Sequence, residues 1–478
     1  MDKHRVCLVC DFFFPNKGGV EMHIWYLAQC LLDLGHKVVV VTHAYGSRQG
    51  VRYMSNGLKV YYLPLGVPYD QVILPTLFAF FPLFRNILLR ENISLVHGHQ
   101  STSSLSNECI FYARTMGYPV VYTDHSLFCL DDWPSSVINK LLEITLADVD
   151  HVIAVSKACR DNLVLRAKLG ARGMAVTTIP NAVDGSKFTP DPSRRYPRDT
   201  VNIVLLSRLV PRKGVDLLTQ LIPRICDRYR QAHFIVGGDG PLRGLLERMC
   251  ERHALHHRVE LLGTVAHSEV RDVLVRGHLF FNCSHTESFC MALLEAASCG
   301  LFVVSTAVGG IPEVLPPGLV SLARPDVDDL ERALGAAIEK CSAGGSKTSG
   351  GGRHSRRRSS RSRSLGKGAA ANTAEHRSLQ DTHASLCALY SWPAVARQTE
   401  AVYSSVLGAP RDSSLWARLR RYASVSGLPA KVLACLWAVA LHVLWRVCEL
   451  LWPQADVERC PDDVAWGGGS GSGGGGGH

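Results

Sequence analysis

The sequence lacks a secretory signal at its start and has no paired arrangement of cysteines. The first residues, MDKHRVCLVCDFFF, carry charges where a signal peptide has an uncharged core of about 7 to 15 residues, and no small-residue cleavage site follows. The 16 cysteines are scattered singly apart from Cys7 and Cys10, which lie in an apolar run where residues three apart on a strand face opposite ways. Export is therefore not expected, and a reduced, cytosolic environment fits best.

Acidic residues are too few to balance the basic ones, but the imbalance is local. The formal net charge is +10, yet residues 347–367 alone contain eight Lys and Arg and no acidic residue. The remainder is close to neutral, so nucleic acid is not an expected partner. With 478 residues, 46% of them hydrophobic, the chain can form two or three globular domains.

Short runs rich in Val, Ile and Leu alternate with stretches of helical periodicity, as is typical of buried parallel strands and crossover helices. The first series of runs comprises residues 5–12, 36–44, 58–64, 93–99, 118–125 and 150–156. The second comprises residues 201–209, 232–240, 258–265, 277–284 and 300–310. The sequence therefore predicts an α/β protein with two doubly wound, Rossmann-like domains, 1–190 and 191–341, divided near 189–199.

Glycines and polar residues follow several predicted strands, where doubly wound domains bind ligands. Gly18 and Gly19 separate the first strand from a helix, which permits either a close backbone approach to an anion or a simple tight turn. His125 follows Asp124 at another strand exit. Either a functional or a structural role suits this histidine.

Two cations follow the first strand of the second domain, in the motif SRLVPRKG. Arg208 and Lys213 precede a glycine and a new helix, so both can converge on an anion near a helix N-terminus. Such a site suits a diphosphate, although a solvated basic turn has the same pattern. Glycine turns at 236–241, which include Gly238, and at 308–313 belong to the same edge of the sheet.

The stretch SHTESFCMALLEAASCG, residues 284–300, places Glu287 and Glu295 among apolar and hydroxylated residues. Its spacing predicts a turn and then a helix with Phe289 and Leu293 on the apolar face. A carboxylate is favourable at a helix start but needs a partner inside an apolar helix. Glu287 is thus either a cap or a ligand of sugar hydroxyls. Glu295 is either an exposed residue or a ligand of a ribose diol.

Several motifs together resemble a known family, the retaining glycosyltransferases of the GT-B fold, family 4, which carry a Glu, seven residues, Glu signature. The matching segments are DFFFPNKGGVEMHI, GHKVVVVTHAYG, VYTDHSLF, IPNAVD, SRLVPRKGVDLL, ESFCMALLEAASCG and STAVGGIPEVLP. The chain most resembles the branch that transfers N-acetylglucosamine to phosphatidylinositol, over residues 4 to about 335 and again at 390–403. Cys290 departs from the broader family, where glycine is usual, but agrees with this branch.

This resemblance implies a two-domain cleft that holds UDP-N-acetylglucosamine as donor and phosphatidylinositol as acceptor, for the first step of glycosylphosphatidylinositol (GPI) anchor biosynthesis. Retention is expected by attack from the face that UDP leaves, without a protein nucleophile. No metal or other cofactor is implied, since two cations can balance the leaving diphosphate. The resemblance also implies an endoplasmic reticulum membrane protein with cytosolic catalytic domains and partner subunits in a GPI N-acetylglucosaminyltransferase complex.

The residues expected to carry the reaction form three sets, of which the first two overlap. The catalytic set is His125, Arg208, Lys213 and Glu287. The donor-binding set is Arg208, Lys213, Gly238, Glu287, Phe289 and Glu295. The phosphate or acceptor loop is Gly18 with Gly19. On the same fold, an epimerase, a hydrolase or another lipid glycosyltransferase is the alternative.

Residues 342–380 interrupt the resemblance and include the run GGRHSRRRSSRSRS. Low hydrophobicity and dense like charge predict disorder for this insertion. A solvated surface segment is the simplest interpretation, while RNA binding, contact with anionic lipid and a non-catalytic scaffold are the alternatives. A closing helix is expected at 381–410, and an acidic, then Gly-rich tail at 453–478.

The segment LPAKVLACLWAVALHVLWRVCELLW, residues 428–452, is long enough to cross a bilayer of about 30 Å. At about 100° per residue its polar residues fall within roughly 60° of one another. They are Lys431, His442, Arg446 and Glu449. Such a helix either lies in the interface or spans the membrane with this stripe against a partner. Basic residues before it and acidic residues after it favour spanning.

Overall fold

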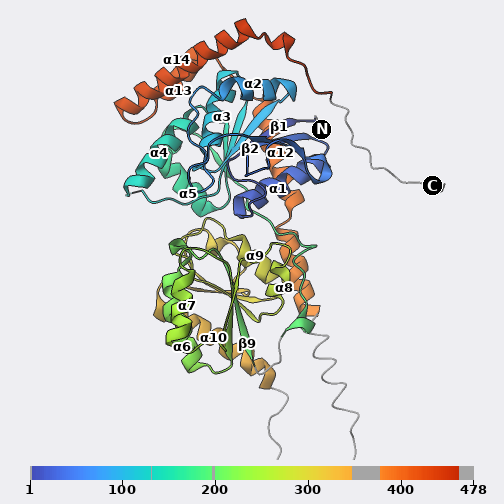
Figure 1. Cartoon of the computed structure of the whole chain (residues 1–478), viewed down its shortest axis with the longest axis vertical. Helices are drawn as coiled ribbons and strands as arrows, with labels where there is room; N and C mark the ends of the chain where they lie inside the picture. Colours follow the sequence, from blue (N-terminus) through green and yellow to red (C-terminus); the bar gives the residue numbers. More distant parts are fainter. Residues whose placement is uncertain (1–2, 131, 196–199, 347–376, 462–478) are drawn as a thin grey trace, which may run out of the picture.

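The protein, seen in a computed structural model, is described for residues 3–130, 132–195, 200–346 and 377–461. Two α/β domains lie one above the other in Figure 1, each built on a largely parallel sheet. Strands β1 to β8 form the sheet of the first domain, and β9 to β14 form that of the second. The predicted class, two doubly wound domains, is confirmed.

The first sheet has the strand order β3-β4-β2-β1-β5-β6-β7-β8, and every pair is parallel except β3 with β4. The chain runs outward from β1 in both directions, so the order switches between β1 and β5, and doubly wound sheets bind ligands at such a point. The strands are β1 (Arg5–Val9), β2 (Lys37–His43), β3 (Gly50–Tyr53), β4 (Lys59–Leu63), β5 (Leu95–His99), β6 (Val120–Asp124), β7 (His151–Ala154) and β8 (Val176–Thr178).

Both faces of this sheet are buried, which explains why its strands read as continuous apolar runs. On β1, Cys7 and Val9 belong to one core cluster, whereas Val6 and Leu8 belong to the cluster on the opposite face. Cys10 joins the second cluster, so the two neighbouring cysteines point apart as expected, and burial raises the pKa of both thiols. The covering helices are α1 (Gly19–Asp33), α2 (Phe81–Arg90), α3 (Ser104–Thr115), α4 (Trp133–Thr145) and α5 (Lys157–Arg166).

The second sheet is entirely parallel and has the order β11-β10-β9-β12-β13-β14. Its strands are β9 (Val201–Leu206), β10 (Ala232–Gly237), β11 (Val259–Gly263), β12 (Leu279–Asn282), β13 (Phe302–Thr306) and β14 (Val320–Ala323). Its helices are α6 (Val215–Arg228), α7 (Arg243–Arg252), α8 (Val270–Leu274), α9 (Met291–Ser298) and α10 (Val327–Ser346). The switch in strand order lies between β9 and β12.

Sequence reasoning missed strands β3, β8 and β14. Each has three or four residues and lies at an edge of its sheet. Every residue of β3 is exposed. Because short edge strands bury little apolar surface, they leave no clear hydrophobic pattern in the sequence.

The ends of the insertion predicted to be disordered, residues 342–380, are helical instead. α10 continues to Ser346, and the described chain is already helical at residue 377. Each helical end belongs to an amphipathic helix whose buried face packs on the second domain. The composition of the insertion does not indicate this packing. The Arg/Ser run and the Gly-rich end of the tail lie outside the described residues.

The chain returns to the first domain through two helices, where one closing helix was expected at 381–410. The first, at 377–389, packs on the second domain and buries Leu386 in its core. The second, α12 (Trp392–Gly408), packs against α1 of the first domain, as Figure 1 shows. The helices separate because the Ser391 hydroxyl accepts a hydrogen bond from the backbone of Ala394 and caps α12.

A buried carboxylate fastens the next helix, α13 (Leu415–Ala423), to the first domain. Asp148 accepts hydrogen bonds from the Nε atoms of Arg418, at 2.9 Å, and Arg421. Arg114 of α3 lies 3.5 Å from the same carboxylate. Asp148 and Arg418 are fully or almost fully buried. Burial of the Asp148 carboxylate is therefore tolerated because these arginines pair with it.

Helix α14 (Leu428–Leu451) lies along the first domain rather than projecting from it (Figure 1). One face buries Ala434, Ala438 and Leu441 in the first-domain core, and Glu449 pairs with Arg85 at 2.7 Å. The opposite face is apolar and exposed, at Leu428, Val432, Leu433, Leu436, Val439, Val443, Val447, Leu450 and Leu451. By length and composition α14 is able to cross a membrane.

We expect Asp148→Asn to lower the melting temperature by at least about 6 °C, since breaking a buried ion pair costs about 3–5 kcal/mol. The loss should appear in near-UV circular dichroism during heating. The control is Asp161→Asn, because Asp161 pairs with Arg160 at the surface and such pairs contribute under about 1 kcal/mol. Equal melting temperatures for the two variants would show that Asp148 does not anchor α13.

Candidate active site

Loops that follow strands of the two domains meet at the domain junction. Ser288 of the second domain donates through its hydroxyl to the backbone carbonyl of His125, at 2.6 Å. Ser156 of the first domain donates in turn to the backbone carbonyl of Ser288, also at 2.6 Å. Since ligands bind beyond the carboxyl ends of parallel strands, the candidate site lies at this junction.

Two glycines hold the loop that carries Glu287. A Cβ on Gly309 would lie 2.1 Å from the Glu287 carbonyl oxygen, and one on Gly310 would lie 2.1 Å from the Ser288 carbonyl oxygen. The amide of Gly310 donates to the Glu287 carbonyl at 2.9 Å. Gly309 also has φ of +52°, a conformation that favours glycine. The predicted glycine turn at 308–313 therefore supports the site through close backbone packing.

Lys213 and Glu287, which the sequence singled out separately, form an ion pair. The Lys213 ammonium donates to Oε1 of Glu287, and the Ser284 hydroxyl lies 2.9 Å from the same oxygen. Both charged side chains are largely buried. Gly214 permits this arrangement, because a Cβ there would lie 1.9 Å from the backbone oxygen of Cys283. Glu287 does not cap α9, which begins at Met291 without a side-chain cap.

Positive charge gathers beside this pair. Arg208 follows β9, and Arg212, which sequence reasoning passed over within the same motif, lies close to it. Burial and the charge of Arg208 lower the pKa of Arg212, while Glu287 opposes the shift. The sequence predicted two cations here, Arg208 and Lys213, and Arg212 adds a third. Three cations favour an anion more strongly than two.

Glu21 of α1, which lies beside Gly18, is within electrostatic range of Arg208 across the junction. Burial raises the pKa of Glu21, and the positive charge of Arg208 opposes the shift. Gly18 is packed tightly, since a Cβ there would lie 2.5 Å from Oε2 of Glu21. A Cβ on Gly19 would meet nothing within 4 Å. Gly19 thus leaves open space at the start of α1.

Glu295 lies inside α9, as predicted, and its carboxylate accepts no hydrogen bond from the described residues. Burial raises its pKa to about 7, and the nearby cation Lys187 opposes the shift. The charge of Glu295 also contributes to the raised pKa of Tyr26, which belongs to α1 of the first domain. Glu295 therefore lies near both domains with its hydrogen-bonding capacity unused.

The two remaining residues of the donor-binding prediction, Phe289 and Gly238, lie in different surroundings. Phe289 is only 2% exposed and packs in an edge-on contact against Tyr390, with 6.0 Å between ring centroids. Its side chain belongs to the core rather than to an open binding surface, because it precedes α9 where the loop turns inward. Gly238 follows β10 beside β9, and a Cβ there would lie 1.8 Å from the Ser207 carbonyl oxygen. Only glycine fits this position.

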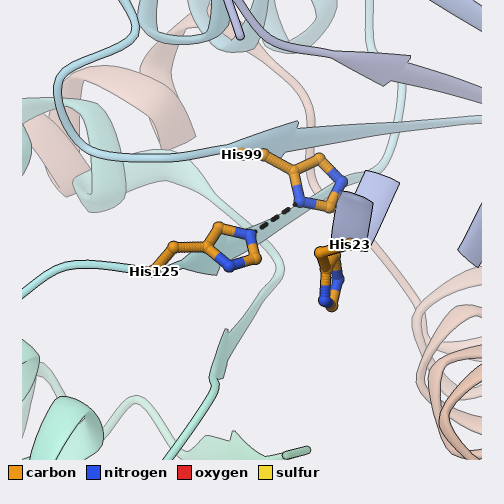
Figure 2. A group of neighbouring side chains, drawn as sticks. All are labelled: His23, His99 and His125. Carbon is orange, nitrogen blue, oxygen red and sulfur yellow. Dashed lines mark hydrogen bonds between the residues drawn. The ribbon is translucent and has the colours of Figure 1, made fainter. Parts of the chain in front are cut away.

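His125 belongs to a cluster of histidines at the ends of β5 and β6, shown in Figure 2. Its Nε2 lies 3.2 Å from Nδ1 of His99, and its ring contacts that of His23 with 4.6 Å between centroids. Burial lowers the pKa of all three, that of His23 to about 4. The imidazoles are therefore neutral at pH 7. Sequence reasoning missed His23 and His99, although VHGH at a strand exit was a usable signal.

A buried ion pair fixes the turn that carries His125. Asp124 and Arg166 approach to 3.0 Å, and both side chains are fully buried. Asp124 also accepts from the backbone amide of His125 at 3.1 Å and from the Ser126 hydroxyl at 3.0 Å. Arg166 donates further to Asn139 at 2.7 Å. The turn after β6 is therefore held on both sides.

Comparison with solved structures supports the class of protein that this fold and site define. Sucrose-phosphate synthase from Thermosynechococcus elongatus has a TM-score of 0.68 at 19% identity and covers 85% of this chain and 100% of its own. Anabaena HepE in complex with UDP and glucose has a TM-score of 0.61 at 17% identity and covers 84% and 100%. The fold is that of GT-B glycosyltransferases. The family model described as glycosyl transferases group 1 matches residues 200–340.

A second family model, described as PIGA (GPI anchor biosynthesis), matches residues 43–132. The A subunit of phosphatidylinositol N-acetylglucosaminyltransferase from Arabidopsis thaliana is 48% identical over 96% of this chain and 94% of its own length. The gpi3 subunit of Schizosaccharomyces pombe is 44% identical over 96% and 92%, and the Homo sapiens counterpart is 53% identical over 71% and 70%. The chain therefore belongs to the PIGA/GPI3 family of phosphatidylinositol N-acetylglucosaminyltransferase subunits.

The raised pKa of Glu295 predicts a pH-dependent gain in stability for Glu295→Gln. Because the folded state favours the protonated acid, wild-type stability should fall as pH rises from the ordinary value near 4.5 to about 7. Gln does not ionise, so the variant should melt higher than wild type at about pH 8 and similarly at about pH 5. Glu247→Gln on the surface of α7 should show no such difference. An equal effect of Glu295→Gln at both pH values would contradict the shift.

Proposed function

We propose that this chain is the catalytic subunit that transfers N-acetylglucosamine from UDP-N-acetylglucosamine to phosphatidylinositol, the first step of GPI anchor biosynthesis. The observation that carries the proposal is the Lys213–Glu287 pair at the domain junction, where the loop of Glu287 meets that of His125 and the charges of Arg208 and Glu295 lie nearby. Family membership supports the choice of sugar and acceptor, since relatives at 40–53% identity carry that activity in their names.

The cations of the second domain are proposed to hold the diphosphate of the donor. Arg208 and Lys213 lie between β9 and α6, close in the chain to the free backbone amides at the start of α6, which favour anions. As the bond from the anomeric carbon to the diphosphate oxygen breaks, negative charge grows on that oxygen. Two fixed cations stabilise this charge, so the proposed reaction takes no metal or other cofactor.

The two glutamates are proposed to bind hydroxyl groups. Glu295 has an unsatisfied carboxylate and suits the paired hydroxyls of a ribose. Glu287 already accepts from Lys213 and has a second oxygen for the donor sugar. Close to Lys213, Glu287 also limits the local excess of positive charge when no donor is bound.

Phosphatidylinositol is proposed to approach from the first domain, past the glycine loop and His125. The neutral His125 imidazole can orient an inositol hydroxyl without adding a positive charge. The hydroxyl oxygen bonds to the anomeric carbon from the face that UDP leaves, and its proton passes to the departing diphosphate oxygen. Configuration is then retained without a covalent enzyme intermediate.

Membrane attachment is proposed to occur through α14. Its inner face is occupied by the first-domain core, and its outer face is a continuous set of exposed aliphatic side chains. Such a face is favourable in a bilayer and unfavourable in water. Attachment at the endoplasmic reticulum, together with partner subunits, would place the junction near a lipid acceptor. A non-catalytic scaffold would not require the charged residues at the junction. The transfer assay distinguishes a transferase from such a scaffold.

We expect Arg208→Ala to reduce transfer by at least about 100-fold, because a charge contact with the diphosphate contributes several kcal/mol in the transition state. Transfer is measured as radiolabel that moves from UDP-N-acetylglucosamine into phosphatidylinositol in membranes containing the complex. Arg224→Ala, which removes an exposed arginine of α6 paired with Asp328, should keep near-normal transfer. If the folded Arg208→Ala protein turns over like the control, the donor assignment is wrong.

Replacing both Leu436 and Val443 by Lys should weaken binding to phosphatidylinositol-containing vesicles by at least about 10-fold, since each charge disfavours insertion by about 2.5–3.5 kcal/mol at full depth. Flotation of the purified chain measures the bound fraction. Leu245→Lys, on the exposed surface of α7, is the matched control. Unchanged flotation of the α14 variant would exclude this face. Alkaline carbonate extraction then distinguishes a spanning helix, which stays in the membrane, from an interfacial one.

A further inference from the structure

Three buried imidazoles converge at the first-domain side of the junction (Figure 2). His23 comes from α1, His99 from the end of β5, and His125 from the turn after β6. One ring nitrogen of each lies within 4.8 Å of those of the other two. Nitrogens bound to one tetrahedral zinc ion at about 2.0–2.1 Å would be roughly 3.3 Å apart. The His99–His125 separation of 3.2 Å already matches that value.

The hydrogen bonds around the cluster leave ligand atoms available. Nδ1 of His23 lies 2.7 Å from Oδ1 of Asn181, which can only accept, so this nitrogen carries the ring proton and Nε2 keeps its lone pair. A histidine whose other nitrogen donates to a fixed oxygen is the usual arrangement of a metal ligand. Asn181 is itself buried. His23 is therefore already oriented as a ligand.

His99 is held in the cluster by its burial and by its neighbours. Its side chain is fully buried, and its Nδ1 is the nitrogen that faces Nε2 of His125. Its Nε2 has no hydrogen-bond partner among the described residues, so this nitrogen can carry the ring proton and leave the Nδ1 lone pair for an ion. The separation of the three nitrogens and the orientation of His23 therefore carry the inference.

We propose that His23, His99 and His125 form a binding site for one transition-metal dication of the zinc class. Three imidazole nitrogens would complete three positions of a tetrahedral ion and leave the fourth for water. Each neutral ring keeps its single N–H proton on the nitrogen that does not bind, so association releases no proton from the histidines. The hydrogen bond between His99 and His125 is replaced by two metal–nitrogen bonds.

The site shares His125 with the proposed chemistry and would oppose it. An ion here occupies the Nε2 atom of His125 that now faces His99, and it places positive charge beside the acceptor side of the junction. The metal would therefore inhibit transfer reversibly rather than assist it. Metal binding itself does not depend on the proposed function, because it requires only these three side chains and their support.

Cobalt(II) absorption spectroscopy on the purified full chain tests the proposal. The three-histidine site should give visible d–d bands without the thiolate charge-transfer band that any of the 16 cysteines would produce. Zinc should abolish these bands by competition and raise the melting temperature. If the wild-type chain shows no d–d bands, or only bands accompanied by thiolate charge transfer, the proposal is overturned.

Variants assign the bands to the cluster. His23→Asn and His99→Asn should each weaken cobalt binding by at least about 10-fold, and Asn181→Leu, which removes only the support of His23, by about 10–100-fold. His151→Asn is the matched control, since His151 lies on β7 of the same domain and bonds Thr177 at 2.8 Å. Cobalt binding unchanged in folded His23→Asn and His99→Asn, or lost equally in His151→Asn, would overturn the assignment. Melting temperatures establish that each variant is folded.

Discussion

The buried ion pair between Asp124 and Arg166 is the constraint on which the first-domain half of the site depends. Two charges without access to water are stable only when their hydrogen-bonding capacity is satisfied. Asp124 meets this need with the backbone of His125 and the side chain of Ser126, so the turn after β6 has a single arrangement. That turn presents the His125 carbonyl to Ser288 of the second domain. A pair inside one domain thus determines how the other domain makes contact.

The first domain is complete only when the end of the chain returns to it. Trp392 of α12 packs in the core beside α1, and the Tyr403 hydroxyl lies 2.6 Å from Nδ1 of His97, next to the histidine cluster. Further on, α13 and α14 cover the opposite core. Residues more than 300 positions apart are therefore needed to build one side of the site. Because the linking helix at 377–389 packs on the second domain, the same segment also limits how far the domains can separate.

Sequence reasoning predicted best those features that depend on residues close together in the chain. The apolar runs gave the central strands, since buried parallel strands have no polar face. Arg208 and Lys213 were found because both follow β9 within a few residues. The missing information concerned pairs distant in sequence: Lys213 with Glu287, and His23 with His99. Phe289 is a further example, because its position in the sequence signature does not indicate that its side chain packs in a core cluster.

The Lys213–Glu287 pair suggests how the proposed donor site keeps its arrangement without a bound diphosphate. Burial and the charge of Arg208 lower the pKa of Arg212, and without a bound anion the repulsion between these two cations would be uncompensated. Glu287 supplies the missing negative charge, held by Ser284 and by the backbone contacts of Gly309 and Gly310. When a diphosphate binds, the Lys213 ammonium can turn to it, because an ammonium has three donors and only one is engaged. In the proposed reaction this exchange would free an oxygen of Glu287 for a sugar hydroxyl, so that anion binding and sugar binding would be linked.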